Sequence, residues 1–210
     1  MSLFELFNMG GLFMWPLLLF SMATVAIALE RAIFIFRNNL RLDDLEAQSV
    51  AYIRRGDMEG ARLYLEKLSA RRMGAKILWT MMSHRELSKD LVERVTETQA
   101  LSCINKLETG FNFLTALGSL SPLTGFLGTV SGMIGAFKSI AEATEVNAQI
   151  VANGIYEALV TTVFGLIIAI IAMVAHSLFS HVVDSFASNV EFACSDMLTE
   201  LALAEKREAA

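Results

Sequence analysis

Three long stretches without a charged residue constrain this chain more than any other feature. They cover residues 11–29, 109–137 and 158–183, and they are 19, 29 and 26 residues long. About 20 consecutive apolar residues are enough for a helix to cross the hydrocarbon core of a bilayer. The alternative, a buried helix in a water-soluble core, is usually shorter and flanked by turn residues. We therefore expect an all-α membrane protein with three transmembrane helices.

The composition fits a chain that is partly in the membrane and partly in water. Hydrophobic residues make up 54% of the 210 residues, the mean hydropathy is +0.51, and a soluble domain is about 45–50% apolar. The net charge of −5 gives no reason to expect a nucleic-acid partner. Cys103 and Cys194 lack a metal-like spacing, so we expect two reduced, structural thiols and no cofactor. The start of the chain has no positive charge and no cleavage site, so we expect the first span to be retained.

The distribution of Lys and Arg predicts the orientation of the spans. Residues 37–106 carry 13 of the 17 basic residues, and the segment before the first span carries none. Because basic residues gather on the cytoplasmic side, we expect a periplasmic N-terminus and a cytoplasmic C-terminus. The expected parts are the outer N-terminus and first span (1–37), a cytoplasmic helical region (38–107), the second span (108–140), a short periplasmic loop (141–152), the third span (153–183) and a cytoplasmic helical tail (184–210).

The pattern of the cytoplasmic region predicts helices that continue those of the membrane. An apolar stripe at helical spacing is formed by Ala61, Tyr64, Leu65 and Leu68. We expect breaks at Gly56–Asp57 and at Gly74. Neither Gly nor Pro occurs between Ser88 and Gly110, or after Gly165. One helix is therefore expected to run from the loop into the second span, and another from the third span into the tail, as parts of a cytoplasmic bundle.

The second and third spans each carry a seam of small residues. In the second span the spacing alternates between three and four, through Gly118, Ser121, Gly125, Gly128, Gly132, Gly135 and Ser139. The third span has a similar face, formed by Gly154, Ala158, Thr161 or Thr162, Gly165, Ala169, Ala172 and His176. Small residues let helix backbones approach closely in lipid. We expect these two helices to pack against each other or against copies of themselves.

Few polar groups interrupt the spans. Pro122 and Thr129 share a helix face, and Pro122 frees a backbone carbonyl about one turn earlier. Thr129 and Thr162 offer hydroxyls, although a membrane threonine can simply bond back to its own helix. No Asp, Glu, Lys or Arg lies near the middle of a span, so this chain cannot relay a proton across the membrane with its own titratable side chains. His176 and His181 are five residues apart and face different directions, which argues against a metal site.

Glu157 lies just before the third apolar stretch and has two interpretations. A carboxylate can be there because a helix N-terminus favours negative charge. It can also be a group that attracts an ion or handles a proton at the mouth of a pore. The residues alone leave both interpretations open.

Two motifs resemble those of the ExbB/TolQ/MotA family. The first is the second-span signature Pro-x-x-Gly-x-x-Gly-Thr-Val-x-Gly-Met, which begins at Pro122 and ends at Met133. The second is the stretch GIYEALVTTVFGL, which begins at Gly154. Three helices with an external N-terminus resemble ExbB and TolQ, whereas flagellar MotA-type stators have four helices and a longer chain. Ile171 stands where many relatives have a proline, which puts in doubt any mechanism that needs a kink there.

The resemblance implies a function. In this family five copies surround a pore that holds the helices of an ExbD- or TolR-like partner, and the partner's aspartate binds the proton. The resemblance implies a pentameric stator subunit of an ion-driven motor in the bacterial inner membrane. It assigns the ion path to Thr129, Thr161, Thr162 and Glu157. It assigns helix kinking and helix packing to Pro122, Gly125, Gly128, Gly132 and Gly165.

Other functions remain open at this stage. A flagellar or gliding-type stator subunit and a non-conducting scaffold that clamps partner helices are the main alternatives. An intramembrane enzyme is disfavoured because no Ser-His, paired-Asp or His-x-x-x-His arrangement occurs. Hydroxyls and a carboxylate suit protons and sodium ions equally well. The sequence also leaves open which outer-membrane process the motor would serve.

Overall fold

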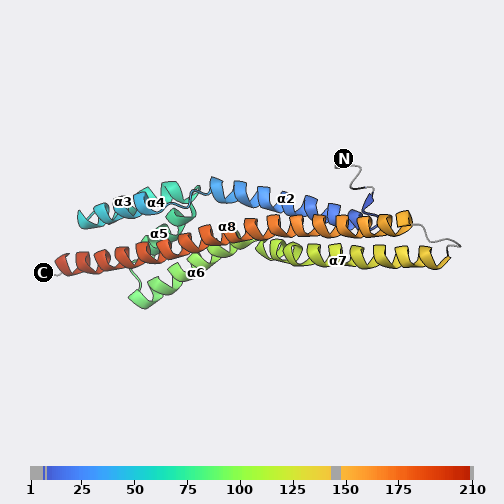
Figure 1. Cartoon of the computed structure of the whole chain (residues 1–210). Helices are drawn as coiled ribbons and strands as arrows, with labels where there is room; N and C mark the ends of the chain where they lie inside the picture. The colour runs from blue at the N-terminus through green and yellow to red at the C-terminus, as the bar shows by residue number, and fades with distance from the viewer. Residues whose placement is uncertain (1–6, 8, 143–147, 209–210) are drawn as a thin grey trace. The chain divides into compact units, whose positions relative to one another are not determined.

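The computed structural model describes residues 7, 9–142 and 148–208, and in these residues every regular element is a helix (Figure 1). The helices are α2 (Met14–Arg37), α3 (Asp43–Arg54), α4 (Met58–Ser69), α5 (Met73–Ser83), α6 (Lys89–Glu108), α7 (Phe111–Glu142) and α8 (Ala148–Glu208). Three helical stretches in the described part are long and apolar enough to cross a membrane, namely Met14–Arg37, Lys89–Glu142 and Val151–Ala204. The second of these stretches covers both α6 and α7. The expected all-α membrane fold is confirmed.

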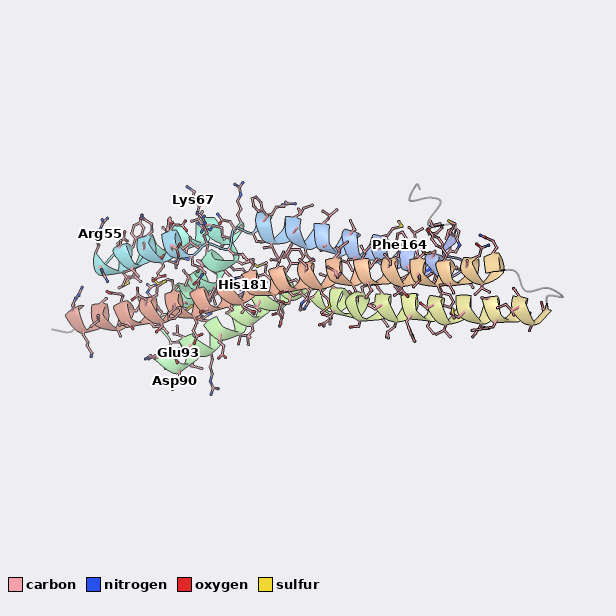
Figure 2. All side chains as sticks on the ribbon, viewed as in Figure 1. Arg55, Lys67, Asp90, Glu93, Phe164 and His181 are labelled. Atoms are coloured by element: carbon pink, nitrogen blue, oxygen red, sulfur yellow. The ribbon has the colours of Figure 1, made fainter. Side chains whose placement is uncertain are left out.

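The helices divide into two compact units. The first contains α2 up to Glu30, all of α7, and α8 up to Leu178. The second contains the end of α2 from Arg31, helices α3 to α6, and α8 from Phe179. The charged side chains labelled in Figure 2, which are Arg55, Lys67, Asp90 and Glu93, all belong to the second unit.

In the first unit, α8 has α2 on one side and α7 on another (Figure 1). Met14 and Leu17 of α2 are 1% exposed and form a cluster with Val160 and Ile168 of α8. Phe164, labelled in Figure 2, packs against this cluster. The opposite face of α2 exposes large apolar side chains, which suits contact with lipid. They include Trp15, Leu19, Met22 and Leu29.

In the second unit, the predicted break at Gly56–Asp57 is confirmed. Gly56 adopts a φ of +77°, which favours glycine, and the Asp57 carboxylate accepts a hydrogen bond from the Gly60 amide at the start of α4. Ala61 and Leu65 are fully buried. The predicted apolar stripe of α4 therefore faces the core of this unit.

The predicted break at Gly74 is wrong. Gly74 lies in the first turn of α5, and the chain breaks earlier, at Ala70–Arg72. A Cβ placed on Gly74 would lie 2.9 Å from Cδ2 of Leu42. Glycine is therefore needed for close packing at this position, and it does not mark a turn.

The predicted continuous helix from the cytoplasmic region into the second span is also wrong. α6 ends at Glu108, and Gly110 adopts a φ of +90° before α7 begins. Near this end, the guanidinium of Arg31 donates a hydrogen bond to the Lys106 carbonyl at 3.1 Å, and Arg31 is only 8% exposed. A buried cation on the last turn satisfies a carbonyl that the helix itself leaves free.

The predicted run of the third span into the tail is confirmed. α8 is continuous over 61 residues, which corresponds to about 90 Å at 1.5 Å per residue. Ile171 occupies the position at which the family resemblance implies a proline in many relatives. It lies inside this unbroken helix and is 47% exposed.

Candidate functional site

Glycines of both α7 and α8 bring the two helix backbones into close contact. A Cβ on Gly125 would lie 2.8 Å from the Thr161 carbonyl oxygen, and a Cβ on Gly165 would lie 2.5 Å from the Ser121 carbonyl oxygen. Neither position has room for a side chain. The buried members of the α7 seam are Gly118, Ser121, Gly125, Gly128 and Gly132. The expectation that the two seams pack against each other is therefore met over this stretch.

The seam does not extend as far as its spacing predicts. Gly135 has nothing within 4 Å of the place where a side chain would begin, and Ser139 is exposed. Ala136 takes their place, and a Cβ on Gly154 would lie 2.5 Å from its methyl carbon. A repeat of 3.5 residues drifts by about 20° per seven residues around a helix of 3.6 residues per turn. Gly135 and Ser139 therefore take no part in the contact between α7 and α8 of one chain, and for them the other expectation, contact with copies of the chain, stays a prediction.

Three threonine hydroxyls meet at this close approach. Thr129 Oγ1 lies 2.5 Å from Thr162 Oγ1 and 3.2 Å from the Ala158 carbonyl oxygen. The hydroxyls of Thr161 and Thr162 both lie 3.2 Å from the Gly125 carbonyl oxygen, and that of Thr129 lies 3.3 Å from it. Thr161 is fully buried, whereas Thr129 and Thr162 are half-buried. We call these three residues the threonine cluster.

Within α7, Thr129 differs from Thr115 and Thr124. The hydroxyls of Thr115 and Thr124 donate to the carbonyls four residues earlier in α7, at 3.2 Å and 2.9 Å. Such bonds are the ordinary way to satisfy a hydroxyl in a membrane helix. Thr129 makes a similar contact but also reaches α8. The cluster thus provides polar contacts between the two helices at a place where side chains would otherwise be apolar.

Pro122 does not interrupt α7, which is continuous from Phe111 to Glu142. Pro122 is half-buried. Its neighbour Ser121 is fully buried and donates a hydrogen bond to the Leu117 carbonyl at 2.6 Å. The proline and the cluster therefore lie on one unbroken helix.

The Glu157 carboxylate is directed toward the chain before α2. Glu157 lies one turn before Thr161, but it points about 140° away from Thr162, because five residues along a helix rotate a side chain by about 500°. Glu157 instead lies against Gly11, because a Cβ on Gly11 would overlap its carboxylate. The helix-terminus interpretation also fails, since α8 begins at Ala148 and the effect of the helix dipole is confined to about the first turn. The sequence did not predict the contact with Gly11, since the Gly10–Gly11 pair indicates a turn before the first span and nothing about Glu157.

The remaining polar candidates form no metal site. Within the described residues no group of three His, Cys, Asp or Glu side chains could hold a metal ion. The ring of His176 instead meets the ring of Phe111 edge-on, with 5.7 Å between the centroids. This contact joins α8 to the N-terminal end of α7, away from the threonine cluster.

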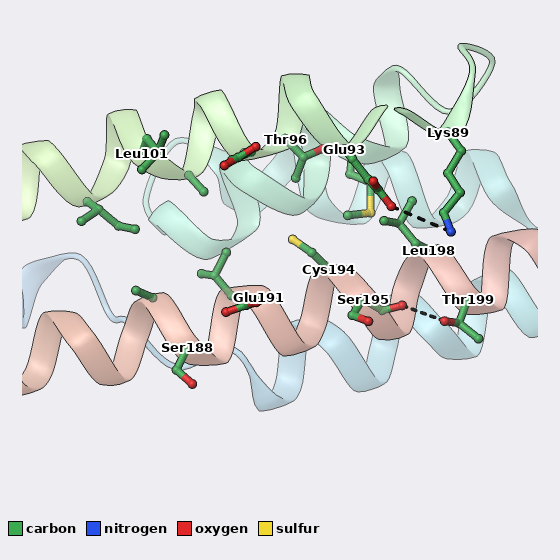
Figure 3. A pocket seen from close by; sticks show the side chains of 16 residues that line it. Lys89, Glu93, Thr96, Leu101, Ser188, Glu191, Cys194, Ser195, Leu198 and Thr199 are labelled. Atoms are coloured by element: carbon green, nitrogen blue, oxygen red, sulfur yellow. Dashed lines mark hydrogen bonds and ion pairs between the residues drawn. The ribbon is translucent and has the colours of Figure 1, made fainter. Parts of the chain in front are cut away.

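The second unit has a groove of about 730 Å³ between α6 and α8 (Figure 3). Its apolar lining includes Leu101, Ile104, Val190 and Leu198. Lys89 and Glu93 lie at one end, 3.9 Å apart, and Cys194 points from α8 toward α6. Burial raises the pKa of the Cys194 thiol to about 12, so the group stays protonated at neutral pH.

These features define a class of protein: an α-helical, multispan membrane protein with a hydroxyl cluster between two tightly packed spans. The chain belongs to the MotA/TolQ/ExbB proton channel family, whose profile matches residues 62–191. The matched region includes the whole threonine cluster, Glu157 and Pro122.

Individual relatives agree with this family. The chain is 27% identical over 201 residues to a biopolymer transport protein ExbB of Salmonella typhimurium, covering 91% of this chain and 80% of the relative. It is 31% identical over 198 residues to a putative biopolymer transport protein ExbB-like 1 of Synechocystis, covering 89% and 75%. A Tol-Pal system protein TolQ of Pseudomonas aeruginosa is 43% identical over 75 residues, which cover 36% of this chain and 32% of the relative.

Proposed function

We propose that this chain is the pore-forming stator subunit of a proton-driven motor in the bacterial inner membrane. Five copies would surround a pore, with the N-terminus in the periplasm and the C-terminus in the cytoplasm. An ExbD- or TolR-like single-span partner would occupy the pore, and the motor would do mechanical work for outer-membrane transport or envelope maintenance. Membership of the proton channel family and the names of the ExbB and TolQ relatives support this proposal.

The threonine cluster is the observation that carries the proposal. Its hydroxyls can donate to and accept from a passing proton carrier. The apolar stretches that contain the cluster residues, 109–137 and 158–183, have no Asp, Glu, Lys or Arg. The titratable group must then come from elsewhere, and an aspartate on a partner helix meets that need.

The driving force is large enough for such a mechanism. One proton crossing a potential of 100 mV releases about 2.3 kcal/mol. A charged carboxylate is costly inside an apolar pore. Protonation of the partner's aspartate would remove that cost and permit movement, and the cluster would hold the neutral acid by hydrogen bonds. Glu157 would attract the ion before it reaches the cluster.

The experiment is a proton-flux measurement on the full chain, purified with its partner and reconstituted in liposomes that contain a pH-sensitive dye. Thr162→Val and Thr129→Val should each lower the flux at least tenfold at unchanged assembly. Thr124→Val is the matched control, because its hydroxyl bonds only to the Leu120 carbonyl in the contacts seen here, and it should keep wild-type flux. Wild-type flux in both cluster variants would overturn the proposal. Absence of flux from the wild-type complex would favour a non-conducting scaffold, for which close helix packing alone suffices.

A further inference from the structure

The chain just before α2 folds back on itself in a tight turn. The amide of Gly10 donates to the Phe7 carbonyl at 3.3 Å, and the amide of Met14 donates to the Gly11 carbonyl at 3.3 Å. The ring of Phe7 meets the ring of Trp15 edge-on, with 5.3 Å between centroids. We call residues 9–13 the N-terminal turn.

The N-terminal turn is fixed against α8. Met14, the first residue of α2, is 1% exposed and packs in the cluster with Val160. A Cβ on Gly10 would overlap the Met14 side chain and lie 3.4 Å from Cγ1 of Val160. The turn therefore has little freedom to move away from this part of α8.

Two observations favour glycine at position 11. Its φ is +65°, a conformation that side chains disfavour. A Cβ there would also overlap Oε1 of Glu157 and lie 2.9 Å from its Cδ. The carboxylate thus occupies the space in which a side chain at position 11 would begin.

We infer that Gly11 is a positioning residue for Glu157, and this inference rests on the proposed function. The absence of a side chain at Gly11 leaves room for the carboxylate beside the N-terminal turn, where Glu157 is partly buried. A long, flexible glutamate otherwise has substantial rotamer freedom. An ion that reaches Glu157 would therefore pass the backbone of this turn, and the geometry of the turn would set the access to the carboxylate.

Labelling of Glu157 with dicyclohexylcarbodiimide tests the inference on the full chain in membranes, because this apolar reagent modifies accessible protonated carboxyl groups. Mass spectrometry would measure the rate at this one residue. Gly11→Ala should raise the rate severalfold by displacing the carboxylate. Gly135→Ala is the matched control, since it adds the same methyl group to a glycine that has open space around it, and it should label at the wild-type rate.

A second variant covers the case in which Gly11→Ala does not fold. Trp15 is 61% exposed, so Trp15→Ala should loosen the turn without adding an atom near Glu157, and labelling should rise again. Both variants should also shift the pH profile of proton flux. Wild-type labelling rates in the folded variants would overturn the inference. Faster labelling with no flux from the wild-type complex would leave the positioning role intact and overturn the proposed function alone.

Discussion

The hydroxyl oxygens of Thr129 on α7 and Thr162 on α8 lie 2.5 Å apart. This short contact depends on the glycines beside it, because a Cβ on Gly128 would lie 2.5 Å from Oγ1 of Thr161. The polar contact and the close approach of the two backbones are therefore one feature. A substitution that weakens the polar contact should therefore also weaken the packing of the two backbones, and the reverse should hold as well.

The Thr129–Thr162 contact should appear as a coupling energy in a double-mutant cycle. Hydrogen bonds between membrane helices contribute about 0.6 kcal/mol on average and up to about 1.7. We expect Thr129→Val and Thr162→Val to be less than additive by an energy in this range, measured by unfolding in detergent. Thr162→Ser keeps the hydroxyl and should retain most of the coupling. Strict additivity of the two valine variants would contradict the contact.

Gly165→Ala should destabilise the packing of α7 on α8. The new methyl group would lie 2.5 Å from the Ser121 carbonyl oxygen, and overpacking of this kind costs about 1–3 kcal/mol. The expected result is a lower unfolding midpoint in detergent. Gly135→Ala should be neutral or stabilising, because it replaces glycine by a better helix former in open space. Equal midpoints for the two variants would show that the seam is not closely packed.

The ion pair between Arg72 and Asp44 should make the stability of the second unit depend on pH. The Arg72 guanidinium donates to both carboxylate oxygens of Asp44, at 2.5 and 2.7 Å, and these bonds hold the pKa of Asp44 below its ordinary value of 3.8. The folded state therefore binds this proton less readily than the unfolded state. The stabilisation is complete above about pH 4 and is lost as the pH falls through the lowered pKa.

Asp44→Asn tests this ion pair. Because Asp44 is more than half exposed, we expect a loss of about 1 kcal/mol at pH 7, which disappears at a pH below the lowered pKa. Denaturant unfolding at both pH values measures it. Asp43→Asn removes the neighbouring carboxylate, keeps the Arg72 pair and should change much less. A constant difference at all pH values would contradict the assignment.

Cys194 should react slowly with iodoacetamide at pH 7.5, although it lines the groove of the second unit (Figure 3). With a pKa of about 12, the reactive thiolate is a minor species, since thiolate is the nucleophile. Ser188→Cys provides an exposed thiol on the rim of the same groove and should label about 100-fold faster or more. Comparable rates at the two positions, measured by mass spectrometry, would contradict the raised pKa.

The sequence predicted the elements that depend on composition alone. Charge-free length predicts spans, and the alternation of small residues predicts a packing face as far as Gly132. At Gly135 the contact with α8 has ended, because a repeat of 3.5 residues drifts around a straight helix, and packing of this position against copies of the chain stays a prediction. The predicted break at Gly74 was wrong because the sequence alone does not distinguish a glycine needed for close packing from a glycine needed for a turn.

The candidate site was only partly predictable for a related reason. Thr161 and Thr162 are candidates for the α8 seam, and Thr129 follows Gly128 of the α7 seam, so the proximity of the three follows from helix periodicity once the seams face each other. The surroundings of Glu157 depend on where α8 begins and on how the N-terminal turn folds back. The start of α8 lies nine residues before Glu157, directly after Asn147, a residue type favoured at helix N-caps, but this local signal does not reveal what packs around Glu157. The contact with Gly11 joins residues 146 positions apart, and no local pattern encodes it.

The carbonyls around the threonine cluster give its two central hydroxyl protons two complete arrangements. In one, Thr129 donates to Thr162, and Thr162 donates to the Gly125 carbonyl. In the other, Thr162 donates to Thr129, and Thr129 donates to the Ala158 carbonyl. Both arrangements satisfy every donor, and they interconvert by rotation of two hydroxyls without any movement of a helix. The direction of donation is therefore reversible, and in each arrangement the threonine that donates to the other hydroxyl accepts no bond itself, so both of its lone pairs would be open to a visiting acid.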